Sequence, residues 1–221
     1  MNVLIFGASG MLGPGVLREC RRADDVSQVT CIVCSPPGLS HPRLREIVHD
    51  DFFGCGRVEN QLANVDACFF CLGVSSFRTE QAQYQRLTLD LTRAAARTLA
   101  RLNPVLHAVY VSGVGSDSSE RGRRFRARIK GRTENQLQQL PFRAAYAFRL
   151  GLIQPLGGIA SKTALSRIGY VVLGPRLPLR RRFWPDQMLT SASLGQAMLA
   201  VVRHGSAKRV PEPADINALA R

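Results

Sequence analysis

Short apolar runs and amphipathic stretches alternate along most of the chain. Residues 2–6 (NVLIF) form a nearly all-apolar run of β-branched and aromatic type, as expected of a strand that is buried on both faces. Similar runs predict further strands at 28–34, 46–49, 66–72, 105–111 and 144–148. Helical periodicity follows residue 13 and returns at about 79–102, about 123–140 and 193–204. Strands that alternate with helices predict an α/β fold, in which helices cover both faces of a doubly wound, mostly parallel sheet.

Two of the predicted helices carry a defined apolar face. In the helix at 79–102 this face consists of Leu87, Leu91, Ala95, Thr98 and Leu102. In the helix at 123–140, Phe125 and Ile129 are four residues apart, and we expect them to dock the helix on the sheet.

Length and composition predict a single domain over residues 1–221. The chain is 45% hydrophobic and 21% charged, so it can bury a sizeable core and does not fit a disordered class. Residues 1–149 form the predicted core, 150–190 a small, irregular C-terminal substrate lobe rich in glycine and proline, and 191–221 a closing helix and tail. No apolar run reaches the roughly 18 residues of a spanning helix, and the first residues resemble a strand rather than a signal peptide. We therefore expect a cytoplasmic protein.

Gly7, Gly10 and Gly13 lie between the first strand and the first helix. In a dinucleotide-binding turn the first glycine permits a tight turn, the second lets backbone N–H groups approach the pyrophosphate, and the third lets helix and strand pack closely. The N-terminus of the following helix favours anions. This order of strand, glycine turn and helix predicts a dinucleotide-binding site, for which a plain strand-to-helix turn is the alternative.

Six cysteines include two C-x-x-C pairs, Cys31/Cys34 and Cys68/Cys71, so a zinc site has to be weighed. The two pairs are farther apart than those of a zinc ribbon, and each pair lies in an apolar run that predicts a buried strand. Residues three apart in a strand point to opposite faces. We therefore favour buried, reduced cysteines and predict no metal site.

Arginine supplies nearly all of the positive charge, since only Lys130, Lys162 and Lys208 are lysines. A net charge of +14 is compatible with phosphates, nucleic acid or an acidic membrane surface as partners. Basic and aromatic residues at 180–184, together with Arg176, could suit a membrane surface or single-stranded nucleic acid. The chain has no recognisable nucleic-acid motif, so we rank these partners below a small-molecule substrate.

The order of segments resembles the short-chain dehydrogenase/reductase superfamily, in its atypical single-domain branch. That branch contains NAD-dependent epimerase/dehydratase-like proteins and the Tat-interacting oxidoreductase group. The resemblance covers nearly the whole chain and rests on Gly7-x-x-Gly10-x-x-Gly13, Asp51-Phe52, Cys71-Leu72-Gly73, Tyr110-Val111-Ser112-Gly113, Lys130-Gly131-x-x-Glu134 and Arg149-Leu150-Gly151. It implies hydride transfer to or from a small carbonyl or alcohol with a nicotinamide cofactor. In this superfamily, helices equivalent to 79–102 often form dimer interfaces, so the resemblance makes a homodimer one possible oligomeric state.

The resemblance assigns roles to the residues that match its motifs. The pyrophosphate would be cradled by the backbone of Ala8, Ser9, Gly10, Met11 and Leu12. Asp51 would accept a hydrogen bond from the adenine amino group, and Lys130 would bond the nicotinamide ribose. The other candidates for cofactor binding follow the strands and are Cys34, Ser35, Phe52, Cys71, Leu72, Gly73 and Gly151. Taken singly, Asp51 could equally be an exposed loop acid and Lys130 a surface cation.

One catalytic residue of the superfamily has no counterpart here. Its acid/base tyrosine precedes the lysine by four residues, because positions four apart share a helix face and the ammonium lowers the pKa of the phenol. In this chain that position is Arg126, whose guanidinium stays protonated and cannot exchange a proton with a substrate. A shifted alignment does not supply a tyrosine, since none occurs at 120–135.

Arg126 leaves two hypotheses open. It could clamp an anionic substrate or a cofactor phosphate, with the proton transferred by Tyr110, Tyr84 or a bound water. Alternatively, the protein is a regulatory or redox-sensing protein that binds the dinucleotide without turning it over.

The basic run at 121–132 contains seven cations in twelve residues. It is either a solvated face or an anion funnel beside the nicotinamide. Two of its members, Arg126 and Lys130, are candidate catalytic residues together with Ser112. A structural role at the end of a strand fits Ser112 at least as well.

The end of the second strand bears on the choice of cofactor. NAD enzymes usually place an acid there for the ribose 2′-hydroxyl, whereas NADP enzymes supply arginine or small hydroxyls for the 2′-phosphate. This strand ends at Cys34-Ser35 without an acid, and Arg43 could reach in from the following loop. We therefore prefer NADP over NAD.

Overall fold

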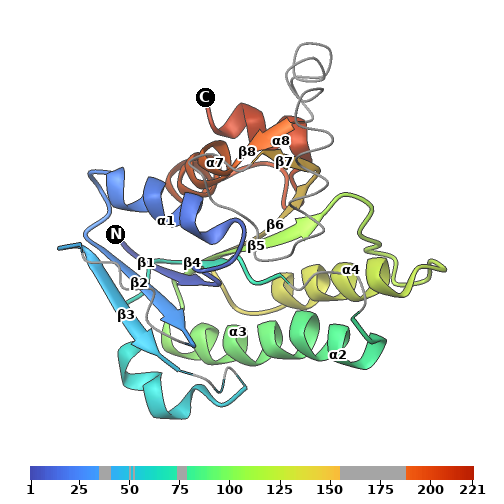
Figure 1. The fold of residues 1–221 in the computed structure, drawn as a ribbon, viewed down its shortest axis with the longest axis horizontal. Coiled ribbons are helices and arrows are strands. Elements are labelled where there is room, and N and C mark those ends of the chain that lie inside the picture. Colours follow the sequence, from blue (N-terminus) through green and yellow to red (C-terminus); the bar gives the residue numbers. More distant parts are fainter. Residues whose placement is uncertain (35–40, 50, 52, 74–78, 155–187) are drawn as a thin grey trace.

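The computed structural model describes residues 1–34, 41–49, 51, 53–73, 79–154 and 188–221. A six-stranded parallel sheet lies at its centre, in the order β3-β2-β1-β4-β5-β6 (Figure 1). The strands are β1 (Asn2–Phe6), β2 (Gln28–Val33), β3 (Leu44–Val48), β4 (Ala67–Phe70), β5 (His107–Gly113) and β6 (Ala144–Leu150). At its centre Ile5 pairs with Cys31 on one side and with Phe69 on the other. The predicted doubly wound, parallel α/β sheet is confirmed.

Helices cover both faces of the sheet (Figure 1). One face carries α1 (Gly13–Arg22), α7 (Ser191–His204) and α8 (Pro213–Leu219), and the other carries η1 (Cys55–Gln61), α3 (Leu91–Leu102) and α4 (Phe125–Gln138). Successive residues of β1 alternate between the two cores, with Val3 and Ile5 in the first, and Leu4 and Phe6 in the second. All four side chains are buried, which explains why the strand has no polar position in its interior. No helix in the described segments is long and apolar enough to cross a lipid bilayer.

The helix predicted at 79–102 consists of three parts. α2 (Gln81–Gln85) and α3 are joined by η2 (Arg86–Asp90), a π-helical turn. Because the π turn is wider, Leu89 joins the buried Tyr84, five residues earlier, in one cluster. Leu91 and Ala95 of the predicted face are buried, and Leu102 packs against the core. The prediction is wrong at Leu87 and Thr98, which are only partly buried, because a constant period of 3.6 residues does not allow for the wider turn. The buried residues of α3 are Leu91, Thr92, Ala95, Ala96, Leu99 and Ala100.

The contacts of α4 also differ from the prediction. Ile129 clusters with Tyr84 and Leu89, and Phe125 packs against the same cluster. The expectation that Phe125 and Ile129 dock the helix on the sheet is therefore wrong, because both side chains pack against α2 and η2 instead. Leu137, about two turns further along, is the residue of α4 that joins the core beneath the sheet.

Several elements are absent from the sequence prediction. They are η1, α8 and a pair of short parallel strands, β7 (Leu152–Gln154) and β8 (Met188–Thr190). The segment before α8 runs along β6, where the N–H groups of Ala147 and Arg149 donate to the carbonyls of Arg209 and Pro211. It thereby covers an edge of the sheet. The predicted lobe at 150–190 lies mostly outside the described residues, as do Arg176 and the patch at 180–184, and its separation from the core stays a prediction.

Four of the five cysteines whose side chains the structure describes are buried. Cys20, Cys31, Cys68 and Cys71 are buried free thiols, whereas Cys34 is exposed, because β2 ends one residue before it; the prediction for Cys34 is wrong. Cys31 and Cys71 lie in one core and Cys68 lies in the other, as expected for side chains on opposite faces of a sheet. Burial raises the pKa of Cys31 and of Cys71 to about 12. Across the described ranges, no group of three His, Cys, Asp or Glu side chains is arranged to hold a metal ion.

Candidate functional site

The glycine turn after β1 has no room for side chains at two of its three positions. Gly7 has a φ of +79°, and a Cβ there would lie 2.7 Å from the carbonyl oxygen of Cys71. A Cβ on Gly13 would lie 2.2 Å from the carbonyl oxygen of Gly7. Gly10 donates its N–H to that same oxygen at 3.0 Å, but it is exposed, and a Cβ there would lie 3.2 Å from the oxygen. The first and third glycines therefore close the turn, and the second leaves its outer face open.

This turn lies where the order of strands in the sheet reverses. β1 pairs with β2 on one side and with β4 on the other. In open α/β sheets, the crevice outside the carboxyl ends of such strands is the usual ligand site. Cys71 follows β4 and closes on the turn: its N–H donates to the carbonyl of Phe6 at 2.9 Å, and its own carbonyl packs on Gly7. The fold thus brings the glycine turn and the predicted motif at Cys71 together, with the partly buried Leu72 and the exposed Gly73 next in the chain.

The start of α1 has no group that neutralises its helix dipole. Leu12 precedes the helix and provides no side-chain cap, and no acidic residue lies in the first turn. The helix dipole therefore favours negative charge at this end. Ala8 and Leu12 anchor the loop in the core, while Ser9 and Met11 are exposed.

Asp51 is exposed beyond the end of β3 and organises its own turn. Its carboxylate accepts the N–H of Phe53 at 3.1 Å, and its carbonyl accepts the N–H of Gly54 at 3.1 Å. This is an Asx turn, the arrangement expected of the loop acid that the sequence left as the alternative. Ser35 and Phe52 lie outside the described residues, and Gly151 is exposed after β6.

Arg43 does not lie where the sequence analysis placed it. Its guanidinium donates to the carbonyls of Ala23 at 2.9 Å and Val26 at 3.2 Å, just before β2 begins. The expectation that it reaches a 2′-phosphate is wrong. Arg43 immediately precedes β3, which runs parallel to β2, so its side chain lies at the amino edge of the sheet, opposite the glycine turn.

A cavity of about 580 Å³ opens between α2, the carboxyl end of β5 and the first turns of α4. It is lined by Gln81, Tyr84, Gly113, Val114, Gly115, Ser116, Arg124, Phe125, Arg126, Ala127 and Lys130. Arg126 and Lys130 therefore share one wall, as their spacing predicts.

Lys130 places its ammonium in this wall, 5.8 Å from the centre of the Tyr110 ring. It forms no hydrogen bond or ion pair with any residue that the structure describes. Burial lowers the pKa of Lys130, and the Glu134 carboxylate opposes this shift. The next residue, Gly131, is a packing requirement, since a Cβ there would lie 1.8 Å from the carbonyl oxygen of Asp117.

Arg126 is half-buried and held from two sides. Its Nη2 donates to the carbonyl of Thr79 at 2.8 Å, and its guanidinium lies 5.5 Å from the centre of the Tyr84 ring. A guanidinium has five N–H donors, so this arrangement leaves donors on the cavity side.

Ser112 belongs to a buried polar network. Its hydroxyl donates to the Glu134 carboxylate and lies 2.9 Å from the hydroxyl of Ser116. Glu134 is paired with Arg149, whose Nη2 lies 2.7 Å and Nε 3.2 Å from the two carboxylate oxygens. These contacts join β5, α4 and β6 and favour the structural role for Ser112. Its catalytic role stays a prediction.

The two tyrosines that could replace the missing phenol are both buried, Tyr110 at 1% and Tyr84 at 3% exposure. Burial raises the pKa of the Tyr110 hydroxyl far above the ordinary value. Of the two, Tyr84 is the one among the described residues that line the cavity. Burial raises the pKa of Tyr84 as well, while a hydrogen bond from Thr88 and the charge of Arg126 oppose the shift.

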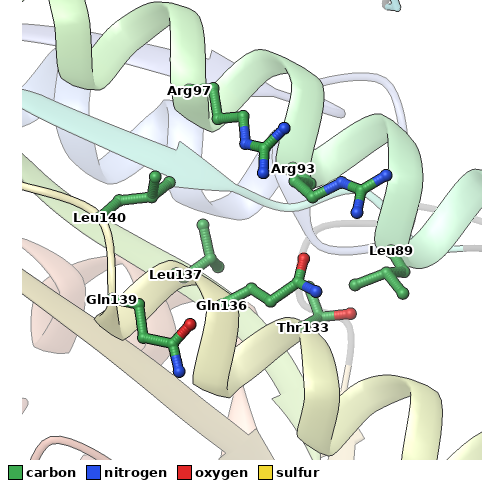
Figure 2. A pocket seen from close by; sticks show the side chains of 8 residues that line it. All are labelled: Leu89, Arg93, Arg97, Thr133, Gln136, Leu137, Gln139 and Leu140. Atoms are coloured by element: carbon green, nitrogen blue, oxygen red, sulfur yellow. The ribbon is translucent and has the colours of Figure 1, made fainter.

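A second, smaller cavity of about 280 Å³ lies between α3 and α4 (Figure 2). Arg93 and Arg97 of α3 reach toward Gln136 and Thr133 of α4 across it. Arg93 pairs with Asp90 at 3.3 Å. This cavity shares no residue with the one at Lys130 and holds none of the predicted site residues.

Comparison of the whole fold with solved structures gives close matches at low sequence identity. MoeE5 in complex with UDP-glucose and NAD superposes with a TM-score of 0.70 at 17% identity, over 96% of this chain and 75% of that one. The UDP-N-acetylglucosamine 4-epimerase from Bacillus cereus has a TM-score of 0.67 at 13% identity, with 96% and 77% covered. The dTDP-glucose 4,6-dehydratase DesIV from Streptomyces venezuelae, with NAD and TYD bound, has a TM-score of 0.67 at 14% identity, with 96% and 75% covered. This chain shares their fold.

Sequence comparison adds nothing to this, since the sequence matches no family model and no curated protein. The structural neighbours are nevertheless epimerase and dehydratase enzymes of the kind that the sequence motifs resemble. The similarity extends over nearly all of this chain, as the sequence resemblance does.

Several residues of the site were missed by the sequence analysis. Ser116 and Gln81 line the cavity, and the guanidinium of Arg86 lies 4.9 Å from the ring of the partly exposed Phe53, near Asp51. Ser116 could have been found, because it follows a predicted strand that ends at the correct edge of the sheet. Gln81 and Arg86 carry no such signal, since they reach the site through the packing of α2 and η2.

Proposed function

We propose that this chain is an NAD(P)-binding oxidoreductase or epimerase-like enzyme, which transfers hydride to or from a small carbonyl or alcohol. The observation that carries the proposal is the glycine turn at the reversal point of the sheet. Gly7 and Gly13 leave no space for a Cβ, and Gly10 keeps the outer face of the turn open next to the start of α1. A closed turn with an open outer face beside a helix N-terminus fits a dinucleotide pyrophosphate.

The proposed cofactor site follows the carboxyl ends of the strands. The backbone of residues 8–12 would hold the pyrophosphate, Asp51 would lie at the adenine end, and Leu72-Gly73 would line the adenosine ribose. Lys130 would bond the nicotinamide ribose from the cavity wall. When bound, the nicotinamide supplies the hydride donor or acceptor.

Proton transfer is assigned to Tyr84 in this proposal. Among the described residues that line the cavity, Tyr84 is the one with a phenol. Burial raises the pKa of Tyr84, and the charge of Arg126 partly offsets this shift. Tyr110 is not among the described lining residues, so the proposal does not give it this role. Arg126 then binds rather than exchanges protons, because its guanidinium stays charged.

NADP remains the preferred cofactor, and NAD the alternative. No acid follows β2 up to the exposed Cys34, so the ribose 2′-hydroxyl lacks its usual acceptor there. Arg43 gives no support, since it lies at the opposite edge of the sheet. Solved neighbours contain NAD, so the preference needs a direct test.

Titration with NADPH and NADH tests the proposal. At about 100 times Kd, a dinucleotide stabilises the native protein by about 2.7 kcal/mol, which thermal unfolding measures. We expect tighter binding of NADPH than of NADH, and we expect Gly10→Ala to weaken both by about 10-fold or more, because the methyl group occupies the outer face of the turn. Gly56→Ala, at an open position outside the site, is the matched control. No stabilisation by either dinucleotide would refute the proposal.

The second candidate is a dinucleotide-binding regulatory or redox-sensing protein, favoured by Arg126 in place of the tyrosine. Dinucleotide binding without turnover across a panel of sugar and small carbonyl substrates would support it. Turnover that is lost in Tyr84→Phe would support the enzyme.

Three further features belong to the proposal. Sugars are the proposed substrate class, because neighbours of the same fold bind UDP-glucose and UDP-glucuronic acid. A homodimer through the helical segment at 79–102 rests on the superfamily resemblance, and sedimentation of the purified chain would test it. The buried free thiols suit a reducing compartment, in keeping with a cytoplasmic location.

A further inference from the structure

The cavity beside Lys130 concentrates positive charge. Arg124, Arg126 and Lys130 line it, and no acidic side chain is among the described residues of its wall. The remaining lining positions are apolar, glycine, or uncharged polar residues. Among the described lining residues, a small anion entering this cavity therefore meets three cations and no like charge.

The other two cations within α4, Arg128 and Arg132, have partners. Arg132 lies 3.7 Å from a Glu120 carboxylate oxygen, and Arg128 donates to the carbonyl of Gly122 at 2.7 Å. Glu134 lies one turn beyond Lys130, but its carboxylate is occupied by Arg149 and by the Ser112 hydroxyl. The acid best placed to neutralise Lys130 is thus bound to another cation.

The ammonium of Lys130 lacks a direct polar partner among the described residues. It forms neither a hydrogen bond nor an ion pair within the part of the chain that the structure describes. Burying an ammonium without a partner is unfavourable, and burial lowers the pKa of Lys130 accordingly. An anion bound beside it would offset this penalty.

Arg126 is oriented to hold the same anion. One of its nitrogens is fixed on the Thr79 carbonyl and its plane lies over Tyr84, so the guanidinium is positioned before a ligand arrives. The remaining N–H donors suit a carboxylate or a phosphate, which accept two parallel hydrogen bonds from arginine. The first turn of α4, at residues 125–127, lines the cavity too and has no acidic residue.

We propose that this cavity binds the substrate through a carboxylate or phosphate group, held between Arg126 and Lys130. The assignment of this anion to a substrate rests on the proposed function. The binding of a small organic anion in the cavity is independent of that function. Arg126 is then a substrate-binding residue, which accounts for a permanent cation at the position of the superfamily's tyrosine.

Isothermal titration of the full chain tests this inference, with D-glucuronate as the carboxylate probe, D-glucose 6-phosphate as the phosphate probe and D-glucose as the uncharged control. We expect one or both anions to bind and glucose not to bind. Arg126→Gln should weaken anion binding by about 10- to 100-fold, as for the loss of a charged hydrogen bond. Arg126→Lys should retain part of the affinity. Arg132→Gln removes the same charge from the same helix outside the cavity and should have little effect.

The outcomes separate this inference from the proposed function. Failure of both anions to bind, or equal weakening in Arg126→Gln and Arg132→Gln, would overturn the anion site even if NADPH binds normally. Anion binding that depends on Arg126 in a chain that binds no dinucleotide would leave the anion site standing and refute the proposed function. The circular dichroism spectrum of Arg126→Gln shows whether the variant is folded, and Arg126→Lys serves as the test if it is not.

Discussion

At the scale of single residues, steric exclusion shapes the dinucleotide turn and charge shapes the neighbouring cavity. Gly7 and Gly13 are required because backbone atoms already occupy the space of a Cβ. Arg126 and Lys130 have room, and what distinguishes them is positive charge without acidic neighbours in the described cavity wall. The turn therefore tolerates almost no substitution, whereas the cavity tolerates changes of shape better than changes of charge.

The closest of these contacts predicts the effect of Gly13→Ala. The new methyl group would meet the Gly7 carbonyl oxygen, which is backbone and cannot move aside. We expect the free energy of unfolding to fall by about 3 kcal/mol, in the upper range for overpacked sites. Chemical denaturation measures this, with Gly56→Ala as the control at an open position. A change below about 0.5 kcal/mol, as at ordinary surface sites, would contradict the claim that backbone atoms exclude a side chain at position 13.

At the scale of elements, α4 divides its residues between the site and the core. Arg126 and Lys130 face the cavity, Glu134 joins the buried network with Arg149, and Leu137 packs beneath the sheet. The π-helical turn η2 has a comparable role, because it brings Tyr84 and Leu89 into one cluster with Ile129 of α4. The position of the cavity wall thus depends on how α4 packs against α2 and η2.

A contact between two other elements gives a pH-dependent prediction. Asp25, in the loop before β2, accepts hydrogen bonds from Arg203 at the end of α7, which lower the pKa of Asp25 below its ordinary value. A carboxylate with a lowered native pKa stabilises the fold above the unfolded pKa, and this contribution is lost as the pH falls through the native pKa. Because the pair is partly exposed, Asp25→Asn should lower the free energy of unfolding at pH 7 by only about 0.5 kcal/mol.

The difference between wild type and Asp25→Asn should shrink as the pH falls below about 4, where the carboxylate of the wild type becomes protonated. Urea denaturation over a pH series measures it. Asp24→Asn, at the neighbouring exposed position, is the control. An equal loss of stability in both variants would show that the contact between Arg203 and Asp25 does not stabilise the fold.

At the scale of the whole molecule, the C-terminal segment completes the sheet and one of its cores. The carbonyls of Arg209 and Pro211 accept hydrogen bonds from the edge strand β6, and Ile216 of α8 is fully buried. Glu212, between them, lies 3.5 Å from Arg149 of the buried network. The end of the described chain is therefore part of the domain.

Removal of residues 206–221 should consequently destabilise the fold and expose the edge of β6. We expect a loss of more than about 3 kcal/mol, since burial of Ile216 alone accounts for about 2–4 kcal/mol. The freed edge should also promote self-association, which light scattering measures. Ile216→Ala should lose stability without self-association, because it leaves the 209–211 segment on β6; self-association of both variants alike would contradict the role of that segment.

The local order of apolar runs and glycines was enough to predict much of this protein. Strands that are buried on both faces must be apolar throughout, and a closed turn before a helix requires glycine, so β1, the turn and α1 could be predicted from thirteen residues. The spacing of Arg126 and Lys130 likewise placed them on one helix face. Sequence periodicity could not anticipate the π-helical turn, because a single wide turn breaks the period on which the prediction rests.

The sequence by itself determined the α/β class, the glycine turn and the absence of a tyrosine at position 126, because each depends on residues close together in the chain. Only the tertiary structure decided which distant groups meet. It placed Arg43 at the wrong edge of the sheet for a cofactor, paired Glu134 with Arg149, and left Lys130 beside Arg126 in a cavity without an acid among its described lining residues. Charges and burial depend on distances through space, and packing, rather than spacing along the chain, sets those distances.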